Sequence, residues 1–102
     1  MKKKLVSFET VLNRQLQNPA VRIEFEHRRF HLQVARLIAK LREESSLTQS
    51  QLAKAAKVSQ PLIARLERGD QNRNPTFETL SKVLNALGYS IQLNLVPLKK
   101  AA

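Results

Sequence analysis

The sequence predicts a mainly α-helical domain, in which a bundle of short helices follows extra N-terminal helices and precedes one short C-terminal β-strand. Apolar residues recur about every 3.6 positions along most of the chain, which is the period of an amphipathic helix. The chain has two glycines, Gly69 and Gly88, and each follows such a segment where a helix would stop. From Tyr89 to Val96 the apolar period changes to two, which is typical of a half-buried strand.

The first segment, residues 1–17, opens with a run of lysines and continues as a short helix. Ser7 is a candidate N-cap, and Glu9 lies in the first turn, where the helix dipole favours a carboxylate. One face of this helix would carry the apolar side chains Phe8, Val11, Leu12 and Leu16. The alternative is a short strand over residues 4–8.

A long helix is expected from Pro19 to about Glu44. Asn18 and Pro19 form a strong start signal, because a cap residue precedes a proline at the first helical position. The apolar positions that recur at helical spacing are Ile23, Phe30, Val34, Leu37 and Leu41. One continuous helix, and two helices with a bend near residues 28–29, both fit this pattern.

Two short helices joined by a turn are predicted between Leu47 and Gly69. Thr48 is the N-cap candidate of the first, and Gln51 has the spacing of a capping box. Ser59 is the N-cap candidate of the second and must cap the N–H of Leu62, because Pro61 has none. The first helix would bury Leu52 and place Ala53 where two helices cross closely. Val58 and Ile63 have the positions of a hydrophobic staple, and Gly69 would end the second helix in the left-handed conformation.

The second of these helices has two distinct faces. Its inner side carries Leu62, Ile63 and Leu66, and its outer side carries Gln60, Pro61, Ala64, Arg65 and Arg68. An amide near the helix start, a small residue and guanidinium groups are the types that contact base edges and phosphates in a DNA major groove. The alternative is an ordinary amphipathic helix whose polar face is only solvated.

The remaining segments are a polar loop, a closing helix and a strand. Residues 70–74 form the loop, in which Arg73 is available to a duplex backbone, and Pro75 or Thr76 begins the closing helix. The apolar stripe of that helix is Phe77, Leu80, Val83, Leu84 and Leu87. The strand carries Tyr89, Ile91, Leu93 and Leu95 on one side. Since a single strand cannot satisfy its own backbone, it needs residues 4–8, a second copy or another protein as its partner.

Length and charge fit one domain with a polyanionic partner. The chain has 102 residues, 42% of them hydrophobic, and a net charge of +10, which indicates nucleic acid or an acidic protein as the partner. It lacks cysteine, and no apolar run approaches the roughly 20 residues of a membrane span. We therefore expect a cytoplasmic, nucleoid-associated protein without a membrane partner.

We expect no catalytic residues, no metal site and no cofactor. His27 and His31 lie one helical turn apart, but the glutamate that a zinc protease places between them is absent and no third ligand is evident. The sequence therefore favours two surface histidines. A basic nuclease that uses one of them is the disfavoured enzymatic alternative.

The central segment resembles the phage-repressor-like (Xre) helix-turn-helix family over residues 32–88. The matching positions are Gln49, Ala53, Val58, Ser59, Ile63, Leu66, Glu67-Arg68-Gly69, Asn74-Pro75, Glu78-Thr79-Leu80 and Ala86-Leu87-Gly88. The resemblance implies a five-helix-type, lambda-repressor-like bundle that binds a specific DNA sequence. It implies base contacts by Gln60 and Arg65, with Ser59 and Pro61 beside them. Phosphate contacts would come from Thr48, Gln49, Arg68, Asn72, Arg73 and Asn74.

Two turn positions depart from the family. Lys57 and Ser46 stand where the family usually has glycine. If either backbone needs positive φ, a side chain there costs about 1 kcal/mol. At Lys57 a phosphate contact would offset this cost.

Almost the whole chain also resembles antitoxins of the HigA type. The matching features are Val6-Ser7-Phe8-Glu9, Leu16, Asn18-Pro19, Arg22-Ile23-Glu24-Phe25, the helix-turn-helix, and a C-terminal strand that ends at Pro97. This resemblance implies a HigB-type ribonuclease toxin as the partner, and repression of the protein's own operon through operator DNA. The alternative is a stand-alone dimeric repressor without a toxin.

The predicted organisation has three parts. Residues 1–30 form an N-terminal extension, residues 31–88 the DNA-binding domain, and residues 89–102 the strand and a basic tail. The extension carries apolar residues that the bundle does not need, and either the bundle or a second protein would cover them. The candidate toxin contacts are Phe8, Val11, Leu12, Leu16, Val21, Phe25 and Phe30, and the candidate homodimer contacts are Ile91, Leu93 and Leu95.

Overall fold

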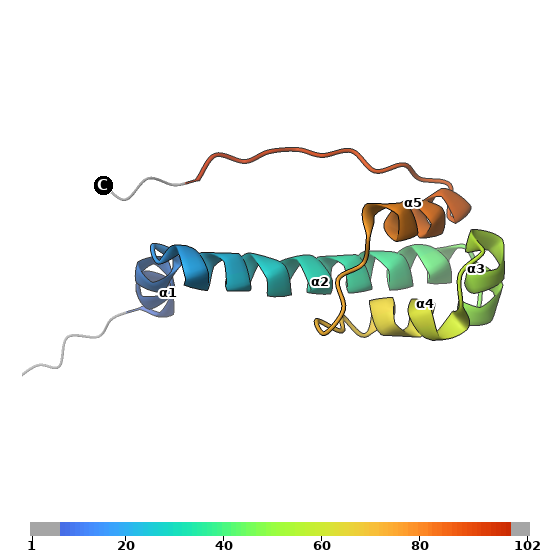
Figure 1. Cartoon of the computed structure of the whole chain (residues 1–102), viewed down its shortest axis with the longest axis horizontal. Coiled ribbons are helices and arrows are strands. Elements are labelled where there is room, and N and C mark those ends of the chain that lie inside the picture. The colour runs from blue at the N-terminus through green and yellow to red at the C-terminus, as the bar shows by residue number, and fades with distance from the viewer. Residues whose placement is uncertain (1–6, 99–102) are drawn as a thin grey trace, which may run out of the picture.

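One long helix forms the axis of the molecule, and shorter helices gather at its two ends (Figure 1). The computed structural model describes residues 7–98, which contain α1 (Phe8–Leu16), α2 (Pro19–Glu44), α3 (Gln49–Ala56), α4 (Gln60–Glu67) and α5 (Phe77–Ala86). Helices α3, α4 and α5 surround the C-terminal half of α2, whereas α1 folds back against its N-terminal end. The molecule is elongated, with extents of 62 × 28 × 24 Å.

The core lies where α2 to α5 meet. Its four largest fully buried side chains are Ile38, Leu52, Ile63 and Val83, one from each of these helices. Burying such a side chain contributes roughly 1.5 to 3 kcal/mol. Because all four helices share this cluster, α3 and α4 are held in a fixed relation to each other and to α2.

Every helix in residues 7–98 begins at a side-chain cap. The caps are Ser7, Asn18, Thr48, Ser59 and Thr76, and each accepts a hydrogen bond from a backbone N–H within its first turn. The predicted capping box of Thr48 and Gln51 is complete, and Ser59 caps the N–H of Leu62 over 3.2 Å as expected. The predictions for Ser7, Asn18, Thr48 and Ser59 are thus confirmed.

Helix α2 is a single helix of 26 residues, which decides between the two alternatives for this segment. Its buried positions are His31, Ala35, Ile38 and Leu41. Ile23, Phe30 and Leu37, which contributed to the predicted stripe, are 67%, 43% and 47% exposed. The face that contacts the other helices is centred on Ile38, so these three residues, seven positions apart, form a separate exposed row.

The C-terminal segment does not form the expected strand. Residues 89–98 run in an extended path, and no strand occurs anywhere in residues 7–98 (Figure 1). Ile91 packs against the core, whereas Leu93 and Leu95 are exposed. A strand needs a second backbone to pair with. The alternative of a partner strand at residues 4–8 is wrong at Phe8, because Phe8 is the first residue of α1. Residues 4–6 of that alternative lie outside the described residues.

The two departures from glycine both fall at left-handed positions. Ser46 and Lys57 each have φ of 57°, beside Gly69 at 68° and Gly88 at 92°. Both non-glycine residues therefore carry the backbone strain anticipated from the sequence.

None of the helices in the described range combines the length and hydropathy needed to cross a membrane.

Candidate nucleic-acid interface

Helix α4 presents a polar face to solvent and an apolar face to the core. Ile63 and Leu66 are buried, whereas Gln60, Pro61 and Arg68 are exposed and Ala64 and Arg65 are half-buried. The predicted division of faces is confirmed. The outer surface of α4 therefore offers an amide at the first helical position, a methyl group in the middle and two guanidinium groups towards the end.

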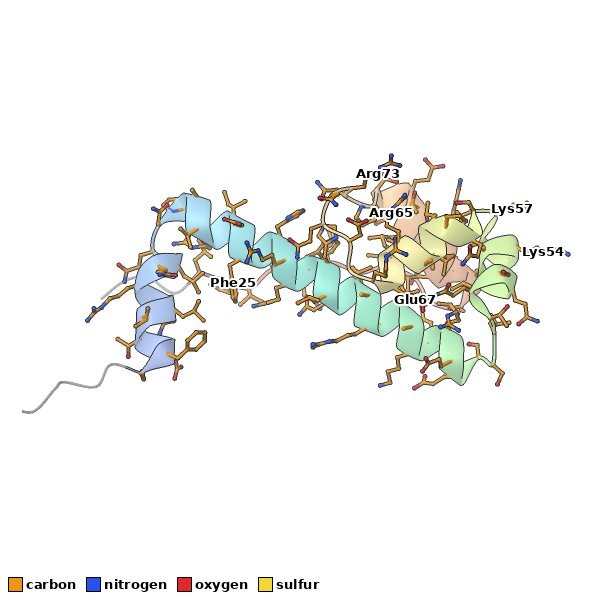
Figure 2. All side chains as sticks on the ribbon, turned by 90° about the horizontal axis from the view of Figure 1, so that it is seen from below. Phe25, Lys54, Lys57, Arg65, Glu67 and Arg73 are labelled. Carbon is orange, nitrogen blue, oxygen red and sulfur yellow. The ribbon has the colours of Figure 1, made fainter. Side chains whose placement is uncertain are left out.

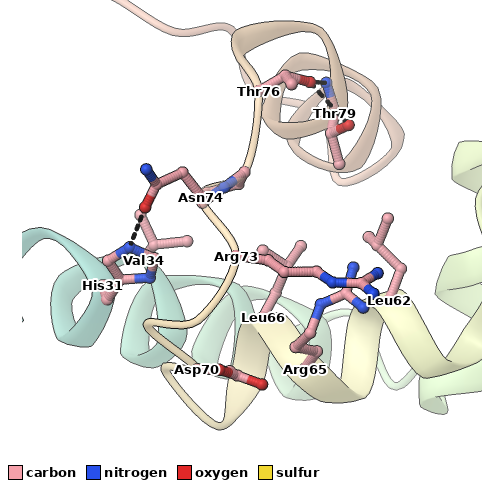
Figure 3. Close-up of a pocket in the computed structure, with 11 residues that line it drawn as sticks. His31, Val34, Leu62, Arg65, Leu66, Asp70, Arg73, Asn74, Thr76 and Thr79 are labelled. Atoms are coloured by element: carbon pink, nitrogen blue, oxygen red, sulfur yellow. Dashed lines mark hydrogen bonds between the residues drawn. The ribbon is translucent and has the colours of Figure 1, made fainter.

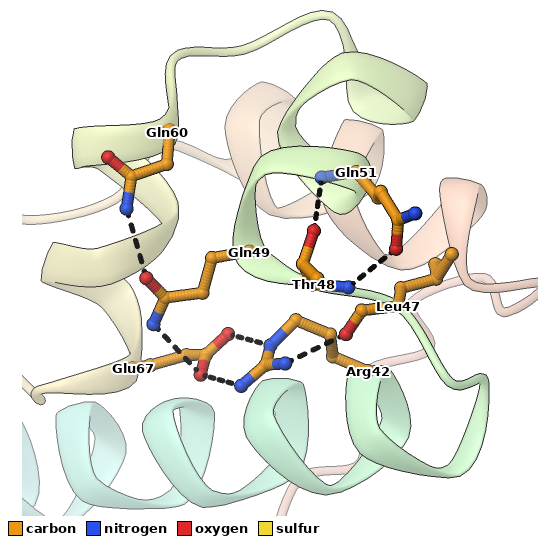
Figure 4. A network of polar contacts seen from close by, with 7 residues as sticks. All are labelled: Arg42, Leu47, Thr48, Gln49, Gln51, Gln60 and Glu67. Carbon is orange, nitrogen blue, oxygen red and sulfur yellow. Dashed lines mark hydrogen bonds and ion pairs between the residues drawn. The ribbon is translucent and has the colours of Figure 1, made fainter.

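A chain of hydrogen bonds ties the start of α4 to α3 and α2 (Figure 4). The Gln60 Nε2 donates to the Gln49 Oε1 over 3.0 Å, and the Gln49 Nε2 donates to the Glu67 Oε1 over 3.4 Å. Arg42 donates to both oxygens of Glu67, at 2.7 and 2.8 Å, and to the backbone oxygen of Leu47 at 2.8 Å. The first residue of α4 is thus held by a relay that ends on α2.

The ion pair at the base of this relay is shielded from solvent. The side chains of Arg42 and Glu67 are 15% and 8% exposed, and their contact is bidentate. The hydrogen bonds that Arg42 donates to the Glu67 carboxylate raise the pKa of Arg42 above its ordinary value, although burial acts in the opposite direction. Residues 42 and 67 are far apart in sequence, and no local pattern indicated that they would pair.

Cationic side chains line the same side of the molecule as α4. Figure 2 shows Lys54 and Lys57 at the end of α3, with Arg65 and Arg73 farther along, whereas Phe25 lies at the opposite end beside α1. Within residues 7–98, none of these four cations forms an ion pair, and neither does Arg68. Lys54 was not among the predicted contacts, although it lies one helical turn before Lys57 and that spacing indicates it.

Arg65 and Arg73 reach over the same small cavity, which separates α4 from the loop that follows it (Figure 3). Its volume is about 90 Å³, and its wall also includes Asp70, Leu62 and Thr79. The two arginines are eight positions apart in the sequence, so folding brings two positive charges to the same cavity beside α4.

The other predicted DNA contacts have additional structural roles. The side-chain oxygens of Thr48 and Ser59 cap α3 and α4, and both residues remain exposed. The backbone N–H of Asn72 donates to the Asp70 Oδ1 over 2.9 Å. Asn74 instead directs its side-chain oxygen towards α2 and away from the group of free cations (Figure 3).

The histidines of α2 are not both on the surface. His31 is 4% exposed, so the expectation of two surface histidines is wrong for this residue. The loop of residues 70–74 covers it, because the Asn74 Oδ1 lies within hydrogen-bond distance of the Nε2 atoms of both His27 and His31. In residues 7–98, no three side chains among histidine, cysteine, aspartate and glutamate are grouped closely enough to hold a metal ion.

Comparison with known proteins agrees with this architecture. Residues 38–94 match the family model described as helix-turn-helix. The chain is 43% identical over 79 residues to an uncharacterized HTH-type transcriptional regulator of Haemophilus influenzae, a match that spans 74% of this chain and 76% of the relative. A second such regulator, from Sinorhizobium fredii, is 44% identical over 52 residues, or 51% of this chain and 65% of the relative. No solved structure matches the chain significantly. The chain therefore belongs to the Xre-type helix-turn-helix family.

Proposed function

We propose that this protein binds a specific site on double-stranded DNA with the outer face of α4, and represses transcription from that site as a two-fold dimer. The observation that carries the proposal is the hydrogen bond from Gln60 to Gln49, which holds a base-contacting amide at the exposed start of α4. The named relatives are HTH-type transcriptional regulators, which is consistent with this function.

The side-chain amide of Gln60 still has one free donor and one free acceptor with which to contact a base. One of its two N–H groups is used by Gln49, which leaves the other N–H and the Oε1 free. This donor–acceptor pair is what a glutamine uses to contact the N7 and N6 of adenine in the major groove. The relay through Gln49, Glu67 and Arg42 fixes the amide before DNA arrives, which lowers the entropic cost of binding.

The size and chemistry of α4 suit the same groove. A helix with its side chains is about 10 to 12 Å across, and the major groove of B-DNA is about 12 Å wide. Ala64 allows close approach at the centre of the outer face. Arg65, one turn after Gln60 and Pro61, supplies a guanidinium group that can contact guanine with two hydrogen bonds.

Cations on either side of α4 would hold the two phosphate backbones. Lys54 and Lys57 lie at the end of α3, and Arg68 and Arg73 follow α4. Each phosphate that they neutralise should add about 0.9 to the slope of log affinity against log salt concentration. Thr48, Gln49 and Asn72 remain candidates for shorter contacts to the backbone.

The C-terminal segment is the proposed dimer contact. Ile91, Leu93 and Leu95 alternate with polar residues in an extended chain whose backbone has no strand partner in residues 7–98. Pairing with the same segment of a second copy would satisfy both backbones and cover Leu93 and Leu95. A two-fold dimer would place two copies of α4 about one helical turn of DNA apart, roughly 34 to 36 Å.

A selection from random duplexes tests this function. The full chain should enrich a two-fold symmetric site, and an Arg65→Ala variant should relax the preference at one base pair in each half. Arg14→Ala is the matched control, because Arg14 is an exposed arginine of α1 at the far end of the molecule. Recovery of random sequence from the wild-type selection would overturn the proposal.

A second candidate function is an antitoxin that also masks a HigB-type ribonuclease toxin, as the resemblance to HigA-type antitoxins implies. The specific observation in its favour is apolar surface outside the DNA-binding bundle. Phe8 is 81% exposed, and Ile23 and Phe30 in the N-terminal half of α2 are 67% and 43% exposed. Val11 is exposed as well, whereas Leu12, Leu16, Val21 and Phe25 are half-buried near the junction of α1 and α2.

Co-expression with the product of the adjacent open reading frame distinguishes the two candidates. An antitoxin should co-purify with a small basic partner at micromolar concentration. Ile23→Asp should release that partner, whereas Glu26→Ala, a change at an exposed polar position of α2, should not. A chain that never associates with its neighbour leaves the stand-alone repressor as the function.

A further inference from the structure

Three potential ligand atoms meet where the loop after α4 crosses α2. The Nε2 atoms of His27 and His31 are 3.0 Å apart, and the Oδ1 of Asn74 lies 2.6 Å from the first and 3.1 Å from the second. His31 is buried and His27 is half-buried. The sequence offered two imidazoles one turn apart without a third ligand, and the fold brings that third group from more than 40 residues away.

Hydrogen bonds can account for only two of the three short distances among these atoms. The Asn74 oxygen has two lone pairs and can accept one N–H from each imidazole. If both Nε2 atoms donate to it, the two ring nitrogens face each other at 3.0 Å with no hydrogen between them. A divalent cation in contact with all three atoms would instead make each of them a ligand.

We propose that His27, His31 and Asn74 form a binding site for a divalent first-row transition metal ion such as Ni²⁺, Co²⁺ or Zn²⁺. Metal–nitrogen bonds of about 2.1 Å at right angles, as on one face of an octahedron, place neighbouring ligand atoms about 3.0 Å apart. The separations of 3.0 Å between the two Nε2 atoms and 3.1 Å between the Asn74 Oδ1 and the His31 Nε2 match such a face, whereas the Oδ1 lies closer to the His27 Nε2, at 2.6 Å. Imidazole ligands favour these ions over Mg²⁺ and Ca²⁺, which prefer oxygen.

The surroundings leave room for the rest of the coordination shell. His31 and Asn74 both line the cavity of about 90 Å³ beside α4, which is large enough for water molecules, and Asp70 lines the same cavity. Arg73 also lines this cavity and opposes a cation, so we expect micromolar and not nanomolar affinity.

The site would join two parts of the DNA-binding bundle. His27 and His31 belong to α2, whereas Asn74 ends the loop that carries Arg73. A bound ion would fix this loop against α2 and so hold Arg73 beside α4. This consequence for DNA affinity rests on the proposed function, but the metal site itself does not.

Titration of the untagged full chain with NiCl₂, followed by calorimetry, tests the site without DNA. We expect one ion per chain, a rise of several degrees in Tm, and no response to MgCl₂. The chain has no other histidine and no cysteine, so His27→Ala should lower the affinity by at least about tenfold. Asn74→Asp, which replaces the neutral ligand oxygen with a charged one of the same shape, should raise it.

Two results would overturn the site. One is a wild-type chain that binds no Ni²⁺, Co²⁺ or Zn²⁺ at a hundred micromolar or so; the other is binding that His27→Ala and Asn74→Ala leave unchanged. Neither variant removes a core side chain, since His27 and Asn74 are not buried, so both should fold. A chain that binds the ion but no DNA would refute the proposed function and leave the metal site intact.

Discussion

The side-chain amide of Gln60 donates to the side-chain oxygen of Gln49 over 3.0 Å, which joins the first residue of α4 to the first residue of α3. Gln49 in turn donates to Glu67, and Glu67 accepts two hydrogen bonds from Arg42. The orientation of one exposed amide therefore depends on three residues behind it, and each link can be tested separately.

Gln49→Ala should weaken binding to the specific DNA site by about 1 kcal/mol, because it frees the Gln60 amide to rotate. The same change made in a Gln60→Ala background should cost less, because only the proposed contact of Gln49 with the DNA backbone is then lost, and a double-mutant cycle measured by fluorescence anisotropy gives the coupling. Gln33→Ala, at an exposed glutamine of α2, is the control. Additive losses in the cycle would show that the two glutamines act independently.

Removal of one partner of the Arg42–Glu67 ion pair should destabilise the fold. Arg42→Ala leaves a shielded carboxylate without its bidentate partner, and we expect a loss of about 3 kcal/mol in the free energy of unfolding, measured with urea. Arg28→Ala is the matched control, because Arg28 pairs with Glu24 on the exposed surface of the same helix and should cost less than about 0.5 kcal/mol. Equal losses for the two variants would contradict the difference in burial.

Lys57→Gly should stabilise the fold and weaken DNA binding at the same time. Glycine relieves the strain of a side chain at φ 57°, for a gain of about 0.5 to 1 kcal/mol after its greater freedom in the unfolded chain is counted. Loss of the lysine should lower the salt slope by about 0.9. Lys54→Gly, inside α3, should instead destabilise by about 1 kcal/mol, and urea unfolding of both variants compares them.

Charged groups in the C-terminal segment should abolish the proposed dimer. Leu93→Asp combined with Leu95→Asp would place carboxylates on the apolar side of the paired segments, and sedimentation should then show a monomer. Gln92→Glu combined with Asn94→Asp adds the same charge on the polar side and should leave the dimer largely intact. Identical behaviour of the two pairs would place the dimer contact elsewhere.

The helix boundaries could be predicted because their signals are local. Thr48 with Gln51, and Ser59 with Pro61, act within one turn of the chain, and the structure has the same caps. The outer face of α4 followed from the helical period for the same reason. These features depend on backbone geometry that a few adjacent residues determine.

Apart from Lys54, the features that the sequence did not reveal depend on contacts between distant segments. Arg42 meets Glu67 across 25 positions, and Asn74 covers His31 across 43. The buried register of α2 is centred on Ile38, and the neighbouring Leu37 is exposed, because the packing of α3, α4 and α5 selects the face. The period-two pattern near Leu93 corresponds to an extended backbone, but a strand also requires pairing with a second backbone, which residues 7–98 do not supply.

The most direct test of the DNA-binding account is an equilibrium titration of the selected duplex and a scrambled duplex with the wild-type chain, Arg65→Ala and Arg68→Ala. The account predicts that Arg65→Ala costs about 1 to 3 kcal/mol on the selected duplex alone, whereas Arg68→Ala weakens both duplexes alike and lowers the salt slope by about 1. An equal loss on the two duplexes for Arg65→Ala, or a wild-type chain that does not distinguish them, would contradict it.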